Sequence, residues 1–241
     1  FSEKCLNSWK EYMSEEYEIK LWTLDDLYTI DDDIAVEIAR IDNYNISKDF
    51  LEIYALYKYG GIYVDQNIKI VEPICDLLAN SNSFLGMDER HRICSNIWYE
   101  KNAKSDFSQR VYECFKEKMV EGEYNPFFVG LQFIFKEVLN DFDFTNKKTQ
   151  YLDNGVVVYS CDYFYPLSYD GHTKSISKNT RTKNYFHYDF ITLKGRLKNI
   201  IYSIFGSYIS TFLFSVARML KKVIKILLFP LLKFKEFRKK D

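Results

Sequence analysis

The chain has 241 residues, of which 47% are hydrophobic and 28% are charged. This balance provides enough apolar surface for a buried core and excludes an intrinsically disordered chain. The five cysteines are widely spaced, with neither a CxxC motif nor a Cys/His cluster, so they indicate neither a zinc site nor a disulfide framework. We therefore expect reduced thiols in a cytoplasmic protein.

The formal net charge of −1 conceals an uneven distribution along the chain. Residues 193–241 contain 12 Lys and Arg but only 2 Asp and Glu, which leaves 21 basic and 32 acidic side chains in residues 1–192. A basic tail on an acidic body predicts that the tail binds an anionic surface. We therefore expect one globular domain over 1–192 and a separate tail over 193–241.

Hydrophobic periodicity predicts alternating helices and strands in the body. In chain order we expect a helix over 5–13, a strand over 17–22, a helix over 47–59, a buried strand over 61–64, helices over 106–120 and 129–139, and a strand over 155–160. Ser47 is the predicted N-cap of the second helix, and Gly60 is predicted to end it. Such alternation favours an α/β sheet with crossover connections.

Segment 49–78 carries the strongest indication of chemistry. It predicts a helix, a Gly60-Gly61 turn, a short apolar strand and then the polar triplet Asp65-Gln66-Asn67. In open α/β sheets ligands bind at the carboxyl ends of strands, which is where the triplet falls. Asp65 offers carboxylate oxygens and Asn67 an amide oxygen, both suited to a hard divalent cation. The alternative is a helix, turn and strand whose polar end is merely solvated.

This segment resembles the DXD sugar-binding region of bacterial capsular-polysaccharide glycosyltransferases and of the related initiating mannosyltransferases. The family pattern is D-x-x-R-x-x-x-L-Y-x-x-G-G-I-Y-x-D-x-D, and the matching positions here are Asp49, Leu56, Tyr57, Gly60, Gly61, Ile62, Tyr63 and Asp65. Residues 8–10 with 17–22, and residues 163–166 with 184–188, resemble further blocks of the family in the same order.

The resemblance implies a GT-A-like, Rossmann-like nucleotide-sugar-binding sheet flanked by helices. It also implies transfer of a sugar from a nucleotide-diphosphate sugar to a glycan or lipid-linked acceptor, with retention at the anomeric carbon and with Mn²⁺ or Mg²⁺ as cofactor. In that scheme Asp65 is the catalytic residue. The implied donor-binding residues are Asp49, Glu52, Gly60, Gly61, Tyr63 and Asp65, and the implied metal ligands are Asp65, Asn67 and His187.

The sequence departs from the family pattern at two motif positions. Asn67 replaces the second Asp, which weakens the predicted metal site because an amide oxygen carries no formal charge. Glu52 replaces the Arg, and a carboxylate there repels a diphosphate unless it faces elsewhere. We also expect the family's first strand, which lines its nucleotide pocket, to be missing from this chain. These departures raise the alternative of a non-catalytic relative that binds a nucleotide sugar or a partner transferase.

The tail combines an uncharged stretch over 200–217 with a basic and aliphatic stretch over 218–240. The uncharged stretch is short for a transmembrane helix, whereas the basic flank is typical of a helix that lies on an anionic membrane. We favour peripheral attachment to the inner face of the plasma membrane. The alternative is a helix that packs on the body or on a partner subunit.

The leading hypothesis is a membrane-associated glycosyltransferase of bacterial surface polysaccharide synthesis. A toxin-like transferase that modifies host protein is a further alternative, against which the small size and the lack of delivery domains argue. No nucleic-acid partner is expected. Asp88, Glu89 and His91 are acid and base types in a predicted loop, and we interpret them as a solvated charge cluster.

Overall fold

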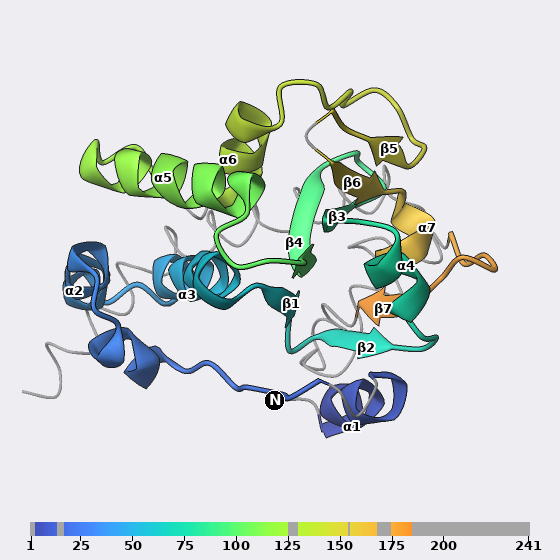
Figure 1. Ribbon diagram of the computed structural model, residues 1–241, viewed down its shortest axis with the longest axis horizontal. Coiled ribbons are helices and arrows are strands. Elements are labelled where there is room, and N and C mark those ends of the chain that lie inside the picture. The colour runs from blue at the N-terminus through green and yellow to red at the C-terminus, as the bar shows by residue number, and fades with distance from the viewer. Residues whose placement is uncertain (1–2, 14–16, 125–129, 154, 168–174, 185–241) are drawn as a thin grey trace, which may run out of the picture. The chain divides into compact units, whose positions relative to one another are not determined.

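A mixed β-sheet lies at the centre of the part of the protein described by the computed structural model (Figure 1). The structure describes residues 3–13, 17–124, 130–153, 155–167 and 175–184. All of them belong to the unit formed by Phe1–Tyr169 and Thr173–Phe186. The predicted domain boundary at 192 and the tail 193–241 lie outside the described residues.

Helices and strands alternate along this unit. The helices are α1 (Glu3–Tyr12), the 3₁₀ helix η1 (Leu24–Thr29), α2 (Asp33–Ile41), α3 (Tyr44–Tyr59), α4 (Cys75–Ala79), α5 (Asp106–Val120), α6 (Gly130–Val138) and α7 (Cys161–Phe164). The strands are β1 (Gly61–Val64), β2 (Ile68–Ile70), β3 (Ser83–Met87), β4 (Ile93–Glu100), β5 (Gln150–Tyr151), β6 (Val156–Tyr159) and β7 (Thr182–Asn184).

The strand order of the central sheet is β1-β4-β3-β6-β5. Strands β3 and β6 are parallel, whereas β1 with β4, β3 with β4 and β5 with β6 are antiparallel. The prediction of an α/β sheet flanked by helices is confirmed, and the mixed sheet is compatible with a GT-A-like fold. The site prediction, however, relied on a rule for parallel sheets, and β1 pairs antiparallel with β4.

Successive side chains of the inner strands enter two different cores, one on each face of the sheet. On β3, Leu85 and Met87 lie in the larger core and Phe84 lies in the smaller one. The apolar run of β6 divides in the same alternating way. Helices α2, α3, α5 and α6 contribute to the larger core, and α4 and α7 to the smaller one. Both faces are therefore covered, which explains why β6 is apolar throughout.

A smaller antiparallel sheet of β2 and β7 lies against α1. The indole N–H of Trp9 donates to the carbonyl of Ile68 at 2.7 Å, and the hydroxyl of Ser8 accepts from the backbone N–H of Ile70 at 3.1 Å. These two hydrogen bonds attach α1 to the chain immediately after Asp65. The helix predicted over 5–13 is confirmed with a slightly earlier start and end.

Helix α3 begins earlier than predicted. Its N-cap is Asn43, whose side-chain oxygen accepts from the backbone N–H groups of Asn45 and Ile46. The N-cap predicted at Ser47 is wrong, because Asn43 is an equally good cap and lies four residues earlier. The predicted end is confirmed, since Gly60 caps the helix with φ 68°. A positive φ at this position favours glycine.

The strand predicted over 17–22 is wrong, because these residues have no regular secondary structure. The apolar Trp22 in this alternating run packs against a helix and not within a sheet. Its ring lies edge-on to that of Tyr54 of α3, with ring centroids 6.3 Å apart. The strand predicted over 61–64 is present as β1, but it is half-buried and not fully buried. The other predicted elements, α5, α6 and β6, are confirmed with ends that differ by at most one residue.

Glu100, at the end of β4, is a buried carboxyl with a raised pKa. Burial raises the pKa of Glu100 from its ordinary 4.5 to about 7, although the hydroxyls of Ser105 and Ser83 and the indole of Trp98 donate to it and oppose this rise. The unfolded chain therefore releases this proton near pH 4.5, whereas the folded chain keeps it to about pH 7.

We expect replacement of Glu100 by Gln to flatten the pH dependence of stability. Between pH 4.5 and 7 the wild-type free energy of unfolding falls as pH rises, by on the order of 3 kcal/mol from this group. Denaturant unfolding at pH 5 and pH 8 measures this loss. Glu117→Gln, on the exposed face of α5, is the matched control and should leave the wild-type slope unchanged. An equal slope in Glu100→Gln and wild type would show that Glu100 is not the titrating group.

Candidate donor-binding site

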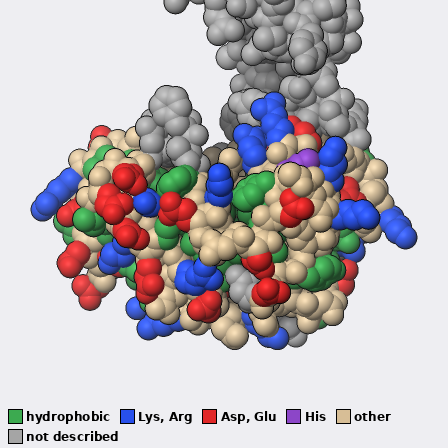
Figure 2. All heavy atoms as spheres, turned by 90° about the horizontal axis from the view of Figure 1, so that it is seen from above, with side chains coloured by type: hydrophobic (Ala, Val, Ile, Leu, Met, Phe, Trp, Pro, Cys, Tyr) green, Lys and Arg blue, Asp and Glu red, His purple; other side chains and the backbone are tan. Residues whose placement is uncertain are grey.

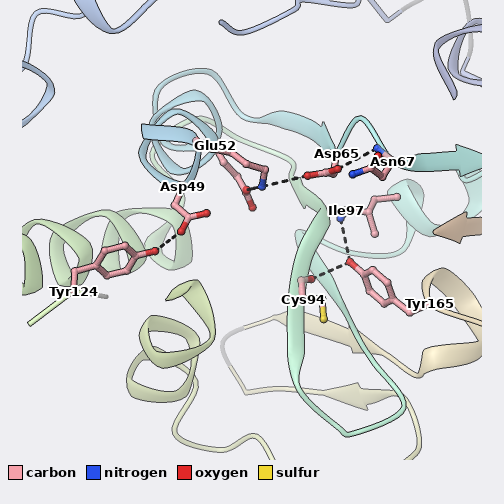
Figure 3. Close-up of polar contacts among 9 residues, drawn as sticks. Asp49, Glu52, Asp65, Asn67, Cys94, Ile97, Tyr124 and Tyr165 are labelled. Atoms are coloured by element: carbon pink, nitrogen blue, oxygen red, sulfur yellow. Dashed lines mark hydrogen bonds and ion pairs between the residues drawn. The ribbon is translucent and has the colours of Figure 1, made fainter. Parts of the chain in front are cut away.

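Asp65 lies directly after β1, where the chain turns toward β2 (Figure 3). Its backbone N–H donates to the carbonyl of Asn96 at 2.8 Å, which holds the end of β1 against β4. Its side-chain Oδ1 accepts the backbone N–H of Asn67 at 3.0 Å. The side chain is only 5% exposed. The polar triplet is thus a tight turn with a fixed carboxylate at its start.

Lys48 of α3 carries the positive charge that faces this carboxylate. Its Nζ lies 3.2 Å from Oδ2 of Asp65 and 3.4 Å from Oε2 of Glu52, one turn further along the same helix. The ammonium also lies 5.5 Å from the ring centroid of Tyr63. Burial lowers the pKa of Lys48, but the negative charges around it outweigh burial and hold this pKa well above its usual value. Lys48 is therefore a permanent cation of the site.

Glu52 is fully buried on the side of α3 that faces the sheet. Burial raises its pKa to about 8, and the positive charge of Lys48 only partly opposes this rise. Burial thus favours the protonated form of Glu52, and the ion pair with Lys48 favours the charged form. The repulsion of a diphosphate that the sequence led us to expect at this position is therefore reduced, because Glu52 is buried outside the pocket lining and paired with Lys48.

Asp49 occupies the neighbouring position on α3 but points toward α5 and α6, as Figure 3 shows. Its Oδ2 accepts the phenolic O–H of Tyr124 at 2.6 Å. Burial raises the pKa of Asp49, and Lys48 and the hydrogen bond from Tyr124 oppose that rise. Asp49 therefore has Tyr124 as its hydrogen-bond partner and does not line the pocket beside Asp65, although the two acidic residues belong to one sequence motif.

A pocket of about 430 Å³ opens beside Asp65. Gly60, Gly61, Tyr63 and Lys48 line it together with Asp65. It also has an aromatic lining of Trp9, Tyr17, Trp22, Tyr44, Tyr59 and Tyr63. Its volume lies within the roughly 300–1,000 Å³ of small-molecule sites, which are typically apolar with few polar groups. Among the predicted donor-binding residues, Asp49 and Glu52 do not line it.

The segment 17–22, which does not form the predicted strand, supplies one wall of this pocket. The ring centroids of Trp22 and Tyr59 are 6.0 Å apart, and Nζ of Lys20 lies 3.7 Å from the centroid of Trp22. Sequence reasoning assigned no role to Lys20 or Lys48. The Lys48–Glu52 spacing of four residues was a visible signal for one ion pair, but not for the contact with Asp65.

The side chains around Asp65 do not fit the predicted Mn²⁺ or Mg²⁺ site. One carboxylate oxygen of Asp65 accepts from Asn67 and the other faces the ammonium of Lys48. Within the described ranges, no three His, Cys, Asp or Glu side chains are grouped closely enough to hold a metal ion. His187, the third predicted ligand, lies outside the described residues. A divalent ion at Asp65 would lie beside the ammonium of Lys48, and the two positive charges would repel each other.

Asp88 belongs to an ordered turn and is not solvated as we expected, whereas Glu89 and His91 are partly exposed. Asp88 is buried, accepts from the backbone N–H groups of Arg90 and Arg92, and forms an ion pair with the guanidinium of Arg92. His91 has φ 59° and its Nδ1 lies 3.1 Å from the carbonyl of Phe144. Neither side chain lines the pocket beside Asp65, so a structural role accounts for both.

A second pocket, of about 460 Å³, lies near Asn80, Lys101, Tyr151 and Gly155. It contains none of the predicted site residues, and its lining offers no acid and no aromatic group apart from Tyr151.

On the face of the protein drawn in Figure 2, Lys and Arg side chains are interspersed with Asp and Glu side chains. In the described part of the chain, no helix is long and apolar enough to cross a membrane.

Part of the chain matches the model of a known protein family. Residues 2–85 match the family model described as "Glycosyltransferase sugar-binding region containing DXD motif". The matched stretch runs from α1 to β3 and includes Lys48, Asp65, Asn67 and the whole lining of the pocket beside Asp65. No curated protein and no solved structure matches the chain significantly. The match supports a transferase that acts on a nucleotide sugar, and it does not distinguish the capsular from the mannosyltransferase subtype.

Proposed function

We propose that the described unit binds a nucleotide-diphosphate sugar in the pocket beside Asp65 and transfers the sugar to a glycan or lipid-linked acceptor. The observation that carries this proposal is the composition of the pocket, in which Lys48 and Asp65 share one cavity with an aromatic wall. A sugar nucleotide carries a flat base, an anionic diphosphate and a hydroxyl-rich sugar. Each of these parts has a chemically suitable counterpart in the lining.

The roles follow from the side-chain chemistry. Trp22 and Tyr59 offer ring faces on which a nucleobase stacks, and Lys48 offers ammonium N–H donors to the diphosphate. The carboxylate of Asp65 accepts hydrogen bonds from the hydroxyl groups of the sugar or ribose. Gly60 and Gly61 both have positive φ. Gly61 leaves open space where a side chain would lie, whereas a side chain on Gly60 would meet the backbone of residues 100–103. Retention at the anomeric carbon, as the resemblance implies, is part of the proposal.

The cellular setting is part of the same proposal. We place the protein in bacterial surface (capsular) polysaccharide synthesis, at the inner face of the plasma membrane. The support is the excess of basic over acidic side chains in residues 193–241, which suits an anionic lipid surface. A lipid-linked acceptor would be presented at that surface.

A non-catalytic role in donor binding is the second candidate function. The observation that favours it is the absence of a second carboxylate at position 67, combined with the pairing of Asp65 and Lys48. Such a protein would bind the sugar nucleotide without turning it over. Release of nucleoside diphosphate in the presence of acceptor membranes separates this candidate from the transferase.

The proposal is tested by thermal unfolding of the chain against UDP-glucose, GDP-mannose and dTDP-glucose, with and without Mn²⁺. A ligand that binds only the folded state stabilises it by about 2.7 kcal/mol at one hundred times its Kd. We expect stabilisation by one nucleotide class and none by free glucose or mannose. If no nucleotide stabilises the folded chain, the donor-binding assignment fails for both candidate functions.

A further inference from the structure

Lys48 is a charged feature of the pocket that the family pattern does not explain. The pattern places its cation at the position of Glu52, and Lys48 lies one helical turn earlier. Residues four apart lie on the same face of a helix, so the positive charge stays on the side of α3 that faces β1. Compared with the family pattern, the positive charge has moved from position 52 to Lys48, and a carboxyl group stands at position 52. The cation therefore remains on the same face of the helix.

The ammonium of Lys48 occupies the position from which a cation would contact Asp65. A divalent ion coordinates carboxylate oxygens at about 2.0–2.6 Å. In this structure Oδ2 of Asp65 faces Nζ of Lys48 at 3.2 Å, and Oδ1 accepts from the backbone of Asn67 at 3.0 Å. Both oxygens thus have partners, and a second cation at Oδ2 would be repelled by the first.

Lys48 also remains accessible to a ligand. Its side chain is 27% exposed, and it lines the same pocket as Asp65. An ammonium held between carboxyl groups loses little side-chain freedom when it binds an anion, because it is already ordered. A phosphate oxygen entering the pocket therefore meets a fixed positive charge.

We propose that Lys48 replaces the divalent ion of this site, so that it contacts the diphosphate of the donor and makes donor binding independent of metal. This inference rests on the proposed function, since it assumes a sugar nucleotide in the pocket. It differs from the family expectation of Mn²⁺ or Mg²⁺ at Asp65 and Asn67. Asn67 contributes a backbone N–H to Asp65, and this contact needs no charge on the side chain at position 67.

The test is calorimetric titration of the wild-type chain with the three sugar nucleotides, in EDTA and then in Mn²⁺. We expect the same affinity in both conditions. Lys48→Ala should weaken binding at least tenfold, whereas Lys48→Arg should keep most of the affinity. Lys58→Ala is the matched control, because Lys58 lies on the exposed side of α3 and outside the pocket, and it should bind as the wild type does.

Two outcomes overturn the inference in different ways. Binding that requires Mn²⁺ and is unchanged in Lys48→Ala would leave the proposed function standing and remove Lys48 from the donor site. The absence of binding in both EDTA and Mn²⁺ would remove the proposed function together with the inference. If Lys48→Ala does not fold, the double variant Lys48→Ala/Glu52→Gln removes both charges of the helical ion pair and is titrated in its place, with the same expected loss.

Discussion

Replacement of Asp65 by Asn is expected to reduce the affinity for the sugar nucleotide by about 10- to 100-fold. The substitution keeps the size of the side chain but removes the charge that pairs with Lys48 and that accepts from sugar hydroxyl groups. A hydrogen bond to a charged group contributes about 1.5–3 kcal/mol, and each 1.4 kcal/mol is a factor of ten in affinity. Calorimetric titration with the nucleotide class found in the thermal panel measures the loss.

The control for this prediction is Asp106→Asn. Asp106 is at the start of α5, its side chain is 80% exposed, and it does not line the pocket. Its replacement should change the affinity less than twofold. Equal affinities of Asp65→Asn and wild type would mean that the donor, if it binds, does so away from the end of β1.

Replacement of Trp98 by Ala is expected to have the largest effect on stability. Trp98 is fully buried in β4, with ring centroids 5.7 Å from Phe107 of α5 and 5.4 Å from Phe135 of α6. Its indole N–H donates to Oε1 of Glu100 at 2.7 Å. Truncation of a buried Trp costs roughly 3–5 kcal/mol, because it leaves a cavity between the sheet and its helices. Denaturant unfolding measures the change.

Tyr151→Ala is the comparison for this substitution. Tyr151 is a large aromatic residue of the same sheet, but it is 77% exposed, so its loss should change the free energy of unfolding by about 0.5 kcal/mol or less. A cost below 1 kcal/mol for Trp98→Ala would contradict the placement of α5 and α6 over β4. A large loss of stability in both variants would show that the burial of the side chain does not determine the cost of its removal.

The helices α1, α3, α5 and α6 were predictable because their signals are local, whereas η1, α2, α4 and α7 were not predicted. Helix α5 has a Ser105 cap and a periodic apolar face over fifteen residues, and both are visible in the sequence. The strands β2, β3, β4, β5 and β7 were missed. Strands β2 and β7 pair with each other from distant parts of the chain, and no local pattern records this pairing. In β4, residues 97–100 pair with β1, and residues 93, 94, 99 and 100 pair with β3.

The site was predictable in part for the same reason. The position of Asp65 after a short strand follows from the Gly60-Gly61 turn, and this placement is correct. The approach of Lys48 to Asp65 depends on how α3 folds back along β1, which no local pattern contains. The aromatic wall likewise depends on the packing of Trp22 on α3, and the alternating residues around it resembled a strand.

Hydrogen exchange of the chain with and without the stabilising sugar nucleotide tests the central claim most directly, because it locates the bound ligand. Amides protected by a ligand exchange more slowly in the segments that the ligand orders. We predict slower exchange in peptides covering 17–22 and 59–66, the two segments that share the pocket lining, and unchanged exchange in peptides covering 79–82 and 151–157 at the second pocket. Protection of the second pocket alone, or of neither segment under saturating nucleotide, would contradict the claim that the donor binds beside Asp65.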